Sequence, residues 1–230
     1  MDIGKAFTFV TDDEGWIGKI AIGGAVVLFS ILLIPIPFLL GYQIAVMRNV
    51  MNGEEYPLPK WENWGKLFIE GLYAIAATLV YTLPVWILAC VGVLFSVFST
   101  DGSGALAGIS VAGIFVITCL ILIVTIALAF LVPAIYIQFV RTNEFGALFR
   151  FGEVIGIARD NIVDIILSYL VVWGANLVLS VVTTILVITI CGPFIASLAG
   201  TAWILVATGH LYGQIAAKSE GKKAEVAYGA

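Results

Sequence analysis

Long apolar segments constrain this chain more than any other feature of its sequence. Four runs, at 67–98, 105–140, 162–190 and 194–217, carry almost no charged side chain. Each exceeds the ~20 residues that an α-helix needs to cross the hydrocarbon core of a bilayer. Inside lipid the backbone has no water to bond to, so a spanning segment must satisfy its own hydrogen bonds as a helix. The four runs therefore predict transmembrane helices.

A fifth apolar run, 20–47, is interrupted by Pro35 and Pro37. The two prolines remove two backbone donors and restrict the residues before them, so a helix must break there. Each half is about 15 residues long, which is short of the ~20 needed to cross. Two geometries stay open: a single kinked span, or a short hairpin that enters the membrane and returns, giving six segments. The hairpin is favoured because it puts all eleven basic residues on one side.

Composition agrees with this pattern. Hydrophobic residues make up 61% of the chain and charged residues only 11%, with a mean hydropathy of +1.10. Soluble domains carry about 25% charged residues, so a surface this poor in charge must meet lipid. We predict an all-α, polytopic membrane protein of about five long helices. It forms one domain over 1–230, with a transmembrane bundle at 20–217 and a polar tail at 218–230.

Two amphipathic segments flank the apolar runs, near 1–19 and near 144–158. In each of them apolar residues recur at helical spacing beside charged residues, which is typical of helices that lie on the membrane surface. Trp and Arg side chains prefer the depth of the headgroups. The residues expected to anchor the chain at this interface are Trp16, Trp61, Trp64, Arg150 and Arg159.

The basic residues predict the orientation of the chain. Three lie in each of the segments 48–66, 141–160 and 218–230, and none lies in the short connections 99–104 and 191–193. Basic loops stay on the cytoplasmic side of a membrane. We therefore expect these three segments, including the C-terminus, to face the cytoplasm from the plasma membrane. A Tyr and a Gln stand just before each basic cluster, and we interpret these pairs as residues at headgroup depth.

The sequence carries no recognisable catalytic, cofactor or metal motif. It has a single histidine, His210, and no P-loop, GxSxG, HExxH or CxxC pattern. The three cysteines, Cys90, Cys119 and Cys191, lie within apolar runs and are expected to be small buried residues. No basic block resembles a nucleic-acid patch. These observations predict no catalytic residue, no bound cofactor, no metal and no nucleic-acid partner.

Uncharged polar residues mark one face of the fourth run. Asn176, Ser180 and Thr183 recur at i, i+4 and i+7, so they share a helical face. Such groups either join helices by hydrogen bonds or line a polar path. His210 is interpreted in the same way, as a helix-packing residue or a proton-linked group. Small-residue pairs that let helices approach closely occur at Gly23-Gly24, Ala196-x-x-x-Gly200 and Gly209-x-x-x-Gly213.

Three tryptophans, Trp86, Trp173 and Trp203, lie far from the ends of their runs. An indole N–H inside a membrane needs a partner. These side chains are expected to pack against polar groups of neighbouring helices, or else to form the wall of a site for a lipid, quinone or pigment.

Short stretches of the N-terminal third, and one near the C-terminus, resemble a known family. They are Gly15-Trp16, Lys19-Ile20, Ile34 to Pro37, Leu40 to Tyr42, Arg48 to Val50, Pro59 to Trp64, Lys66 to Phe68 and Leu211 to Gln214. The resemblance is to polytopic membrane proteins of archaea and some bacteria described as domain of unknown function 4013. It covers about 65 residues specifically, and the middle of the chain matches only in hydrophobicity. It implies a small helical membrane bundle and no particular activity.

Three functions fit these features. The first is a non-catalytic protein that acts by association, as an accessory subunit, scaffold or assembly factor of a membrane complex. Its partners would be the lipid bilayer and other membrane subunits or further copies of itself. The alternative is a small channel or carrier for a solute or lipid, since broken helices often line transport sites. The third is sensing of lipid or membrane shape by the two amphipathic segments.

Overall fold

All regular structure in the described part of the chain is helical. The computed structural model describes residues 1–100, 104–189 and 191–228, and its all-α fold confirms the predicted class. The elements are α1 (Ile3–Thr8), α2 (Trp16–Phe29), η1 (Ser30–Leu32), α3 (Ile36–Met51), α4 (Trp64–Thr100), α5 (Gly104–Thr142), η2 (Phe145–Phe149), α6 (Phe151–Asp160), α7 (Ile162–Ile185), η3 (Leu186–Ile188) and α8 (Gly192–Tyr228).

Within the described residues, four helical segments are long and apolar enough to cross a membrane: Trp64–Val97, Val111–Thr142, Ile162–Ile188 and Gly192–Gly221. They coincide with the four long apolar runs. Helices α4 and α5 continue through Pro84 and Pro133, respectively. The polar tail is not a separate segment, because α8 extends as one helix to Tyr228.

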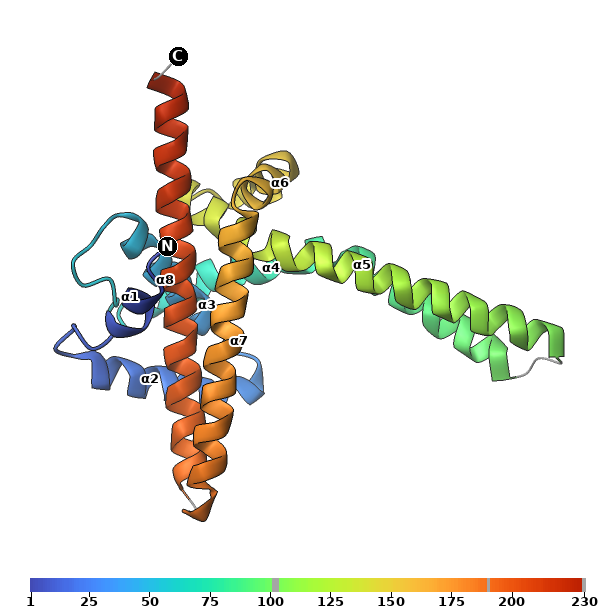
Figure 1. The fold of residues 1–230 in the computed structure, drawn as a ribbon, viewed down its shortest axis with the longest axis horizontal. Helices are drawn as coiled ribbons and strands as arrows, with labels where there is room; N and C mark the ends of the chain where they lie inside the picture. The colour runs from blue at the N-terminus through green and yellow to red at the C-terminus, as the bar shows by residue number, and fades with distance from the viewer. Residues whose placement is uncertain (101–103, 190, 229–230) are drawn as a thin grey trace.

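The long helices form two hairpins that leave a common base in different directions (Figure 1). One hairpin pairs α4 with α5, and the other pairs α7 with α8. The base contains α1, α2, α3 and α6 together with the adjoining parts of α4, α5, α7 and α8. The chain is therefore a bundle at its base, and it opens into two separate arms beyond it.

The first apolar run folds back on itself at the predicted break. Helix α2 ends at Phe29, Leu33 adopts a positive φ of 62°, and α3 begins at Ile36. Pro37 stands in the first turn of α3, where its missing N–H costs no helical hydrogen bond. Trp61 binds the Lys19 carbonyl of α2 and stacks on Tyr42 of α3. One side chain thus contacts both halves of the folded-back run, and both halves also pack on α8.

The structure differs from the prediction at both amphipathic segments, because each is divided into shorter helices. The segment 1–19 contains the short helix α1, a turn, and the start of α2. Asp2 caps α1 by accepting a hydrogen bond from the Lys5 amide, at 2.9 Å. The segment 144–158 is divided between η2 and α6, because Arg150 leaves helical geometry at ψ 75°. Neither segment is one continuous helix.

The interior of the base consists of two apolar clusters that share α3 and α8. The first joins these helices to α4, α5, α6 and α7. The second joins them to the turn after α1, to α2, to the 58–61 segment and to the start of α4. Large buried members of the first are Ile44, Met47, Ile135, Ile137, Leu148, Ile165 and Ile215. Members of the second include Phe9, Val10, Tyr42, Trp61 and Val206.

Helices α3 and α4 cross in backbone contact. A Cβ placed on Gly41 would collide with the Leu67 carbonyl, and one on Gly71 would collide with the Pro37 carbonyl. Each helix thus has a glycine where it touches the backbone of the other, and the crossing contains two such contacts. Small residues allow this approach in membrane proteins, where dispersion contacts replace the hydrophobic effect as the source of packing energy.

The predicted small-residue pairs also pack within the chain. A Cβ on Gly209 would lie 3.0 Å from the Gln43 carbonyl oxygen, and one on Gly213 would lie 2.7 Å from that of Met47. Gly24 faces Leu198, and Gly200 faces Leu179. These positions join α8 to α3, α2 and α7.

Replacing Gly41 with alanine is expected to destabilise the base by about 3 kcal/mol, the upper end of typical overpacking costs, because the added methyl group would collide with the Leu67 backbone. Thermal unfolding in detergent, followed by circular dichroism, measures the effect. Gly65→Ala is the matched control, since a Cβ there meets nothing within 4 Å. An equally stable Gly41→Ala variant would contradict the crossing.

Candidate functional site

An aromatic stack holds the base together where the N-terminal hairpin meets the 57–63 segment. Trp61 lies parallel to Tyr42, with ring centroids 4.0 Å apart, and donates its indole N–H to the Lys19 carbonyl at 2.8 Å. The Tyr42 hydroxyl donates to the Pro59 carbonyl at 2.7 Å. Burial raises the pKa of the Tyr42 phenol, and the negative charge of Asp13 raises it further. Trp61, which the sequence predicted to anchor the chain at the membrane interface, is thus buried in the base.

Two ion pairs lie beside this stack. The Lys19 ammonium contacts Asp13 at 2.6 Å and donates to the Leu58 carbonyl at 2.8 Å. Arg48 binds both carboxylate oxygens of Glu70 at 3.1 Å. Both pairs are mostly buried, with side-chain exposures between 11% and 15%. A buried pair needs further hydrogen bonds to offset the loss of hydration, and here neighbouring carbonyl and amide groups supply them.

Arg48 connects three parts of the chain. It belongs to α3, its guanidinium binds Glu70 of α4, and its Nε donates to the Asn143 side chain at 2.9 Å. Asn143 follows α5 in a left-handed conformation, with φ 53°. Lys66 approaches Glu70 from the surface at 3.8 Å. This arginine therefore fixes where both helices of the α4–α5 arm leave the base.

The charged groups line a pocket of about 490 Å³ in the base. Four cationic and four anionic side chains border it, so its charge is balanced. Carboxylates and ammonium groups can hold a zwitterion or a phospholipid headgroup. Among the described residues, no cluster of histidine, cysteine and carboxylate side chains could hold a metal ion. The charged residues of the lining are Asp13, Lys19, Arg48, Glu54, Lys60, Glu62, Lys66 and Glu70.

The other four predicted anchors lie at the surface or near it. Trp16 is half-buried and meets Trp203 edge-on, with centroids 5.4 Å apart. Trp64 is 43% exposed at the start of α4. Arg150 pairs with Glu144 at 2.8 Å, and Arg159 is exposed on α6.

The polar face of the fourth run points away from the interior of the chain. Asn176 and Ser180 are exposed, and Thr183 is half-buried. Asn176 donates to the Val172 carbonyl at 2.8 Å, and the Thr183 hydroxyl donates to the Ser180 carbonyl at 2.9 Å. These bonds stay within α7. Within the described residues these side chains bond only to their own helix, so their role in joining helices or in lining a path stays a prediction.

His210 lies on α8 and is not part of the polar face of α7. It is buried, its ring lies 4.5 Å from the ring of Phe9, and its Nδ1 is 2.9 Å from the Gln214 amide nitrogen. Gln214 in turn binds the backbone of Asp2 at both its N–H and its carbonyl. The histidine thus helps to seat α1 on α8.

Several predictions of burial are reversed by the structure. Cys90, Cys119 and Cys191 are free and exposed, where the sequence predicted small buried residues. Trp86 and Trp173 are 61% and 65% exposed on the two arms. The Tyr and Gln residues before the basic clusters, interpreted as a headgroup belt, are largely core residues instead. Tyr42, Gln43, Tyr136, Gln138 and Tyr212 are all buried.

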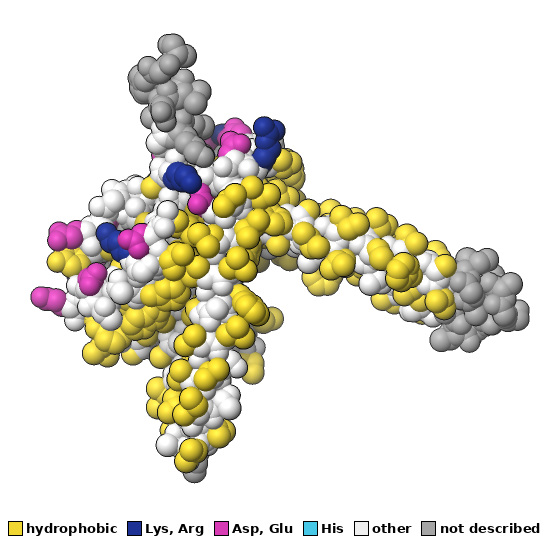
Figure 2. Space-filling view, in the orientation of Figure 1, with side chains coloured by type: hydrophobic (Ala, Val, Ile, Leu, Met, Phe, Trp, Pro, Cys, Tyr) yellow, Lys and Arg dark blue, Asp and Glu magenta, His cyan; other side chains and the backbone are white. Residues whose placement is uncertain are grey.

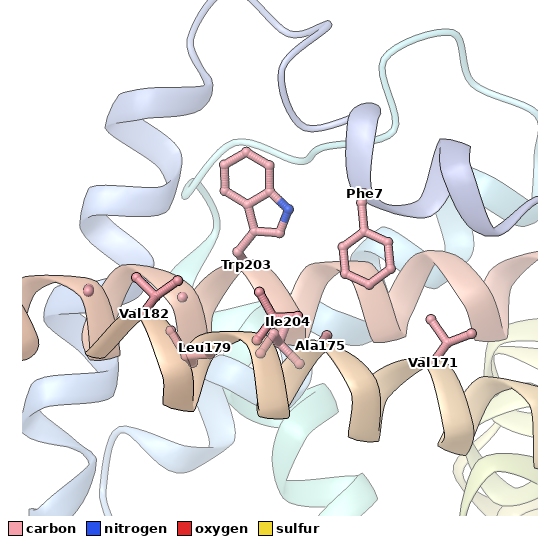
Figure 3. A pocket seen from close by; sticks show the side chains of 10 residues that line it. Phe7, Val171, Ala175, Leu179, Val182, Trp203 and Ile204 are labelled. Carbon is pink, nitrogen blue, oxygen red and sulfur yellow. The ribbon is translucent and has the colours of Figure 1, made fainter. Parts of the chain in front are cut away.

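A second cavity, of about 550 Å³, lies along the seam between α7 and α8. Its lining is almost wholly apolar, and Phe7 of α1 stands over one part of it (Figure 3). Trp203, which the sequence offered as the wall of a ligand site, borders this cavity. We call it the seam groove.

Comparison with known proteins places the chain in a family. Its sequence matches the family described as "Protein of unknown function (DUF4013)" over residues 25–188, which is more than half of the chain. The chain belongs to the DUF4013 family. The match confirms the resemblance seen in the sequence. It includes the middle of the chain, where the resemblance depended on hydrophobicity, and ends before Leu211. No curated protein and no solved structure matches this DUF4013 chain.

The Arg48–Glu70 pair and the seam groove were missed from the sequence. The sequence predicted only that Arg48 lies in the basic segment 48–66. Their separation in the chain gives no sign that they meet. A polar residue just inside an apolar run is a weak signal of such a pair, because an unpaired charge there is costly.

Replacing Arg48 with methionine is expected to destabilise this DUF4013 chain by about 3 kcal/mol, because Glu70 would keep a buried charge without its partner. The double variant Arg48→Met, Glu70→Met should recover part of that loss, and thermal unfolding measures both. Arg150→Met is the control. Its ion pair with Glu144 is about half exposed, so it should change stability by less than about 1 kcal/mol. Equal effects at the two arginines would contradict the structural role of Arg48.

Proposed function

We propose that this chain acts by association, as an accessory, scaffold or assembly subunit of a membrane complex. The observation that carries the proposal is the exposed polar face of α7. Within the described residues, the Asn176 carboxamide oxygen accepts no hydrogen bond. A polar group at the lipid-facing surface of a spanning helix is costly when unpaired, and such groups commonly bond to a neighbouring helix. The face therefore suits a transmembrane helix of another subunit or of a second copy.

The shape of the molecule supports the same function. Hydrophobic side chains cover both arms, while charged side chains gather on the base (Figure 2). Large apolar residues of both arms are strongly exposed, among them Phe115 at 70% and Trp173 at 65%. Lipid alone can cover such surfaces, but the angle between the arms also leaves room for further helices. The arms thus offer separate surfaces joined to one base.

A channel or carrier is the second function that we propose to test. The charged pocket of the base favours it, because that pocket could hold a small polar solute. Solute flux into liposomes that contain the purified chain would support transport. Such flux would also require a polar path that several copies build together, since the polar face of α7 lies on the outside of one chain.

We also propose that the base faces the cytoplasm from the plasma membrane. The basic residues of 48–66, 141–160 and 218–230 support this orientation. A fluorescent protein fused after Ala230 is expected to fold and fluoresce, while alkaline phosphatase at that position should be inactive. Phosphatase inserted between residues 100 and 104 should be active. The opposite pattern would reverse the orientation.

Association is tested by weakening the α7 face. Asn176→Leu and Ser180→Ala are each expected to lower recovery of the partner, or of the homo-oligomer, by about 3- to 18-fold. This range corresponds to hydrogen bonds of roughly 0.6–1.7 kcal/mol between membrane helices. Native mass spectrometry after gentle extraction from the cell's own membrane measures the recovery.

Thr118→Val is the control for this test. It removes an exposed hydroxyl from α5 that binds only its own helix, at the Ile114 carbonyl. Recovery should be unchanged in this variant. A wild-type chain found only as a lone monomer, or α7 variants that recover partners as well as wild type, would rule out association through α7.

A further inference from the structure

The seam groove has the chemistry of an alkyl-chain site. Its walls are aliphatic and aromatic side chains of α7, α8 and α1, with almost no polar surface. Small residues, Ala175, Ala196 and Gly200, form part of its lining and leave the space open. Both long helices that border it belong to membrane-spanning segments, so the medium around the groove is hydrocarbon. An empty cavity would forfeit dispersion contacts that an alkyl chain can supply.

The length of the groove fits one leaflet. Along α7 it extends from Val171 to Val182, which is about 16 Å at a rise of 1.5 Å per residue. The hydrocarbon core of a bilayer is about 30 Å thick, so one leaflet contributes about 15 Å. A partner helix lying along α7 through the whole hydrocarbon core would extend about twice this length. A single acyl chain needs only the length observed.

The position of α1 prevents a partner helix from lying in the groove, but it leaves room for a flexible acyl chain. Phe7 projects from α1 over the seam, so a straight helix lying along α7 would meet it (Figure 3). This cap is held in place, because the Gln214 side chain binds the Asp2 backbone at 2.6 and 2.8 Å. An acyl chain can lie beneath such a cap.

Among the described residues that line the groove, Trp203 has the one side chain with a polar group. Within the described part of the chain its indole N–H has no acceptor, and its nitrogen lies on the side of the ring that faces Phe7 (Figure 3). Its contact with Trp16 places it close to the start of α2, one turn before the Lys19–Asp13 ion pair. The ester carbonyl of a phospholipid is an acceptor that such an indole N–H can bind in an otherwise apolar groove.

We propose that the seam groove binds one phospholipid, with an acyl chain along Ala175, Val178 and Val182 and an ester carbonyl accepting a hydrogen bond from Trp203. The site is separate from the α7 face proposed for association, because Asn176 and Ser180 do not line the groove. A bound lipid would complete the surface of the α7–α8 arm near α1.

The test uses the full chain in nanodiscs of phosphatidylethanolamine and phosphatidylglycerol. The chain is moved into mild detergent, and retained lipid is counted by native mass spectrometry. The wild type is expected to keep one phospholipid per chain. Ala196→Phe should reduce this retention at least tenfold by filling the groove. Trp203→Phe, which keeps an aromatic ring but loses the N–H, should reduce it by about 2- to 10-fold, the effect of one hydrogen bond.

Ala127→Phe is the matched control, because it adds the same ring to an exposed alanine of α5 and should retain lipid as the wild type does. Val182→Phe is a second blocking variant, because Val182 also lines the groove and its side chain is 40% exposed, which leaves room for the larger ring. Lipid retention in this variant tests the proposal if Ala196→Phe does not fold. Full retention in a folded, blocked variant would overturn the proposal. A wild type that keeps only detergent or a second polypeptide would also overturn it.

Discussion

The backbone contact between α3 and α4 is the constraint on which the rest of the structure depends. At Gly41 and Gly71 the two helices meet without side chains between them. This approach brings Arg48 of α3 within reach of Glu70 of α4, and it sets the direction in which the α4–α5 arm leaves the base. In hydrocarbon, apolar surfaces gain little by meeting each other in place of lipid. Close packing of complementary surfaces, together with buried hydrogen bonds and ion pairs, must therefore hold the helices together.

The base and the arms differ in how they are stabilised. In the base, ion pairs, an aromatic stack and bonds to loop carbonyls join residues far apart in the chain, such as Trp61 and Lys19. Each arm depends mainly on contact between its own two helices. Stability should thus be concentrated in the base, and the arms should adapt to what surrounds them. This division suits a protein whose outer surfaces bind other molecules.

The fold was largely predictable because length and hydrophobicity alone identify spanning helices. The break at Pro35 and Pro37 was also predictable, since proline acts through backbone geometry that does not depend on the rest of the fold. Burial was not predictable in the same way. Trp61 was expected at the surface and lies in the base, while Trp173 was expected to pack and is exposed. Lipid is as apolar as a protein core, so periodicity cannot separate the two faces of a membrane helix.

The candidate sites depended on the same missing information. The polar residues of α7 were identified as one face, yet no sequence pattern could show which way that face turns. The seam groove is formed by Phe7 together with residues more than 160 positions away, and nothing local marks such a meeting. Sequence reasoning found Trp203 because a tryptophan far inside an apolar run is unusual, and that remains the only local signal of the groove.

The N-terminal hairpin has a mechanical consequence. Its tip, Ile31 to Ile34, is 63–85% exposed. A hairpin of half-length helices that enters a bilayer displaces lipid from one leaflet only, while helices that cross the bilayer displace it from both. Where the hairpin enters from the side of the base, the chain occupies more area in that leaflet than in the other. Such a body acts as a wedge, so its energy depends on the curvature and lateral tension of the bilayer around it.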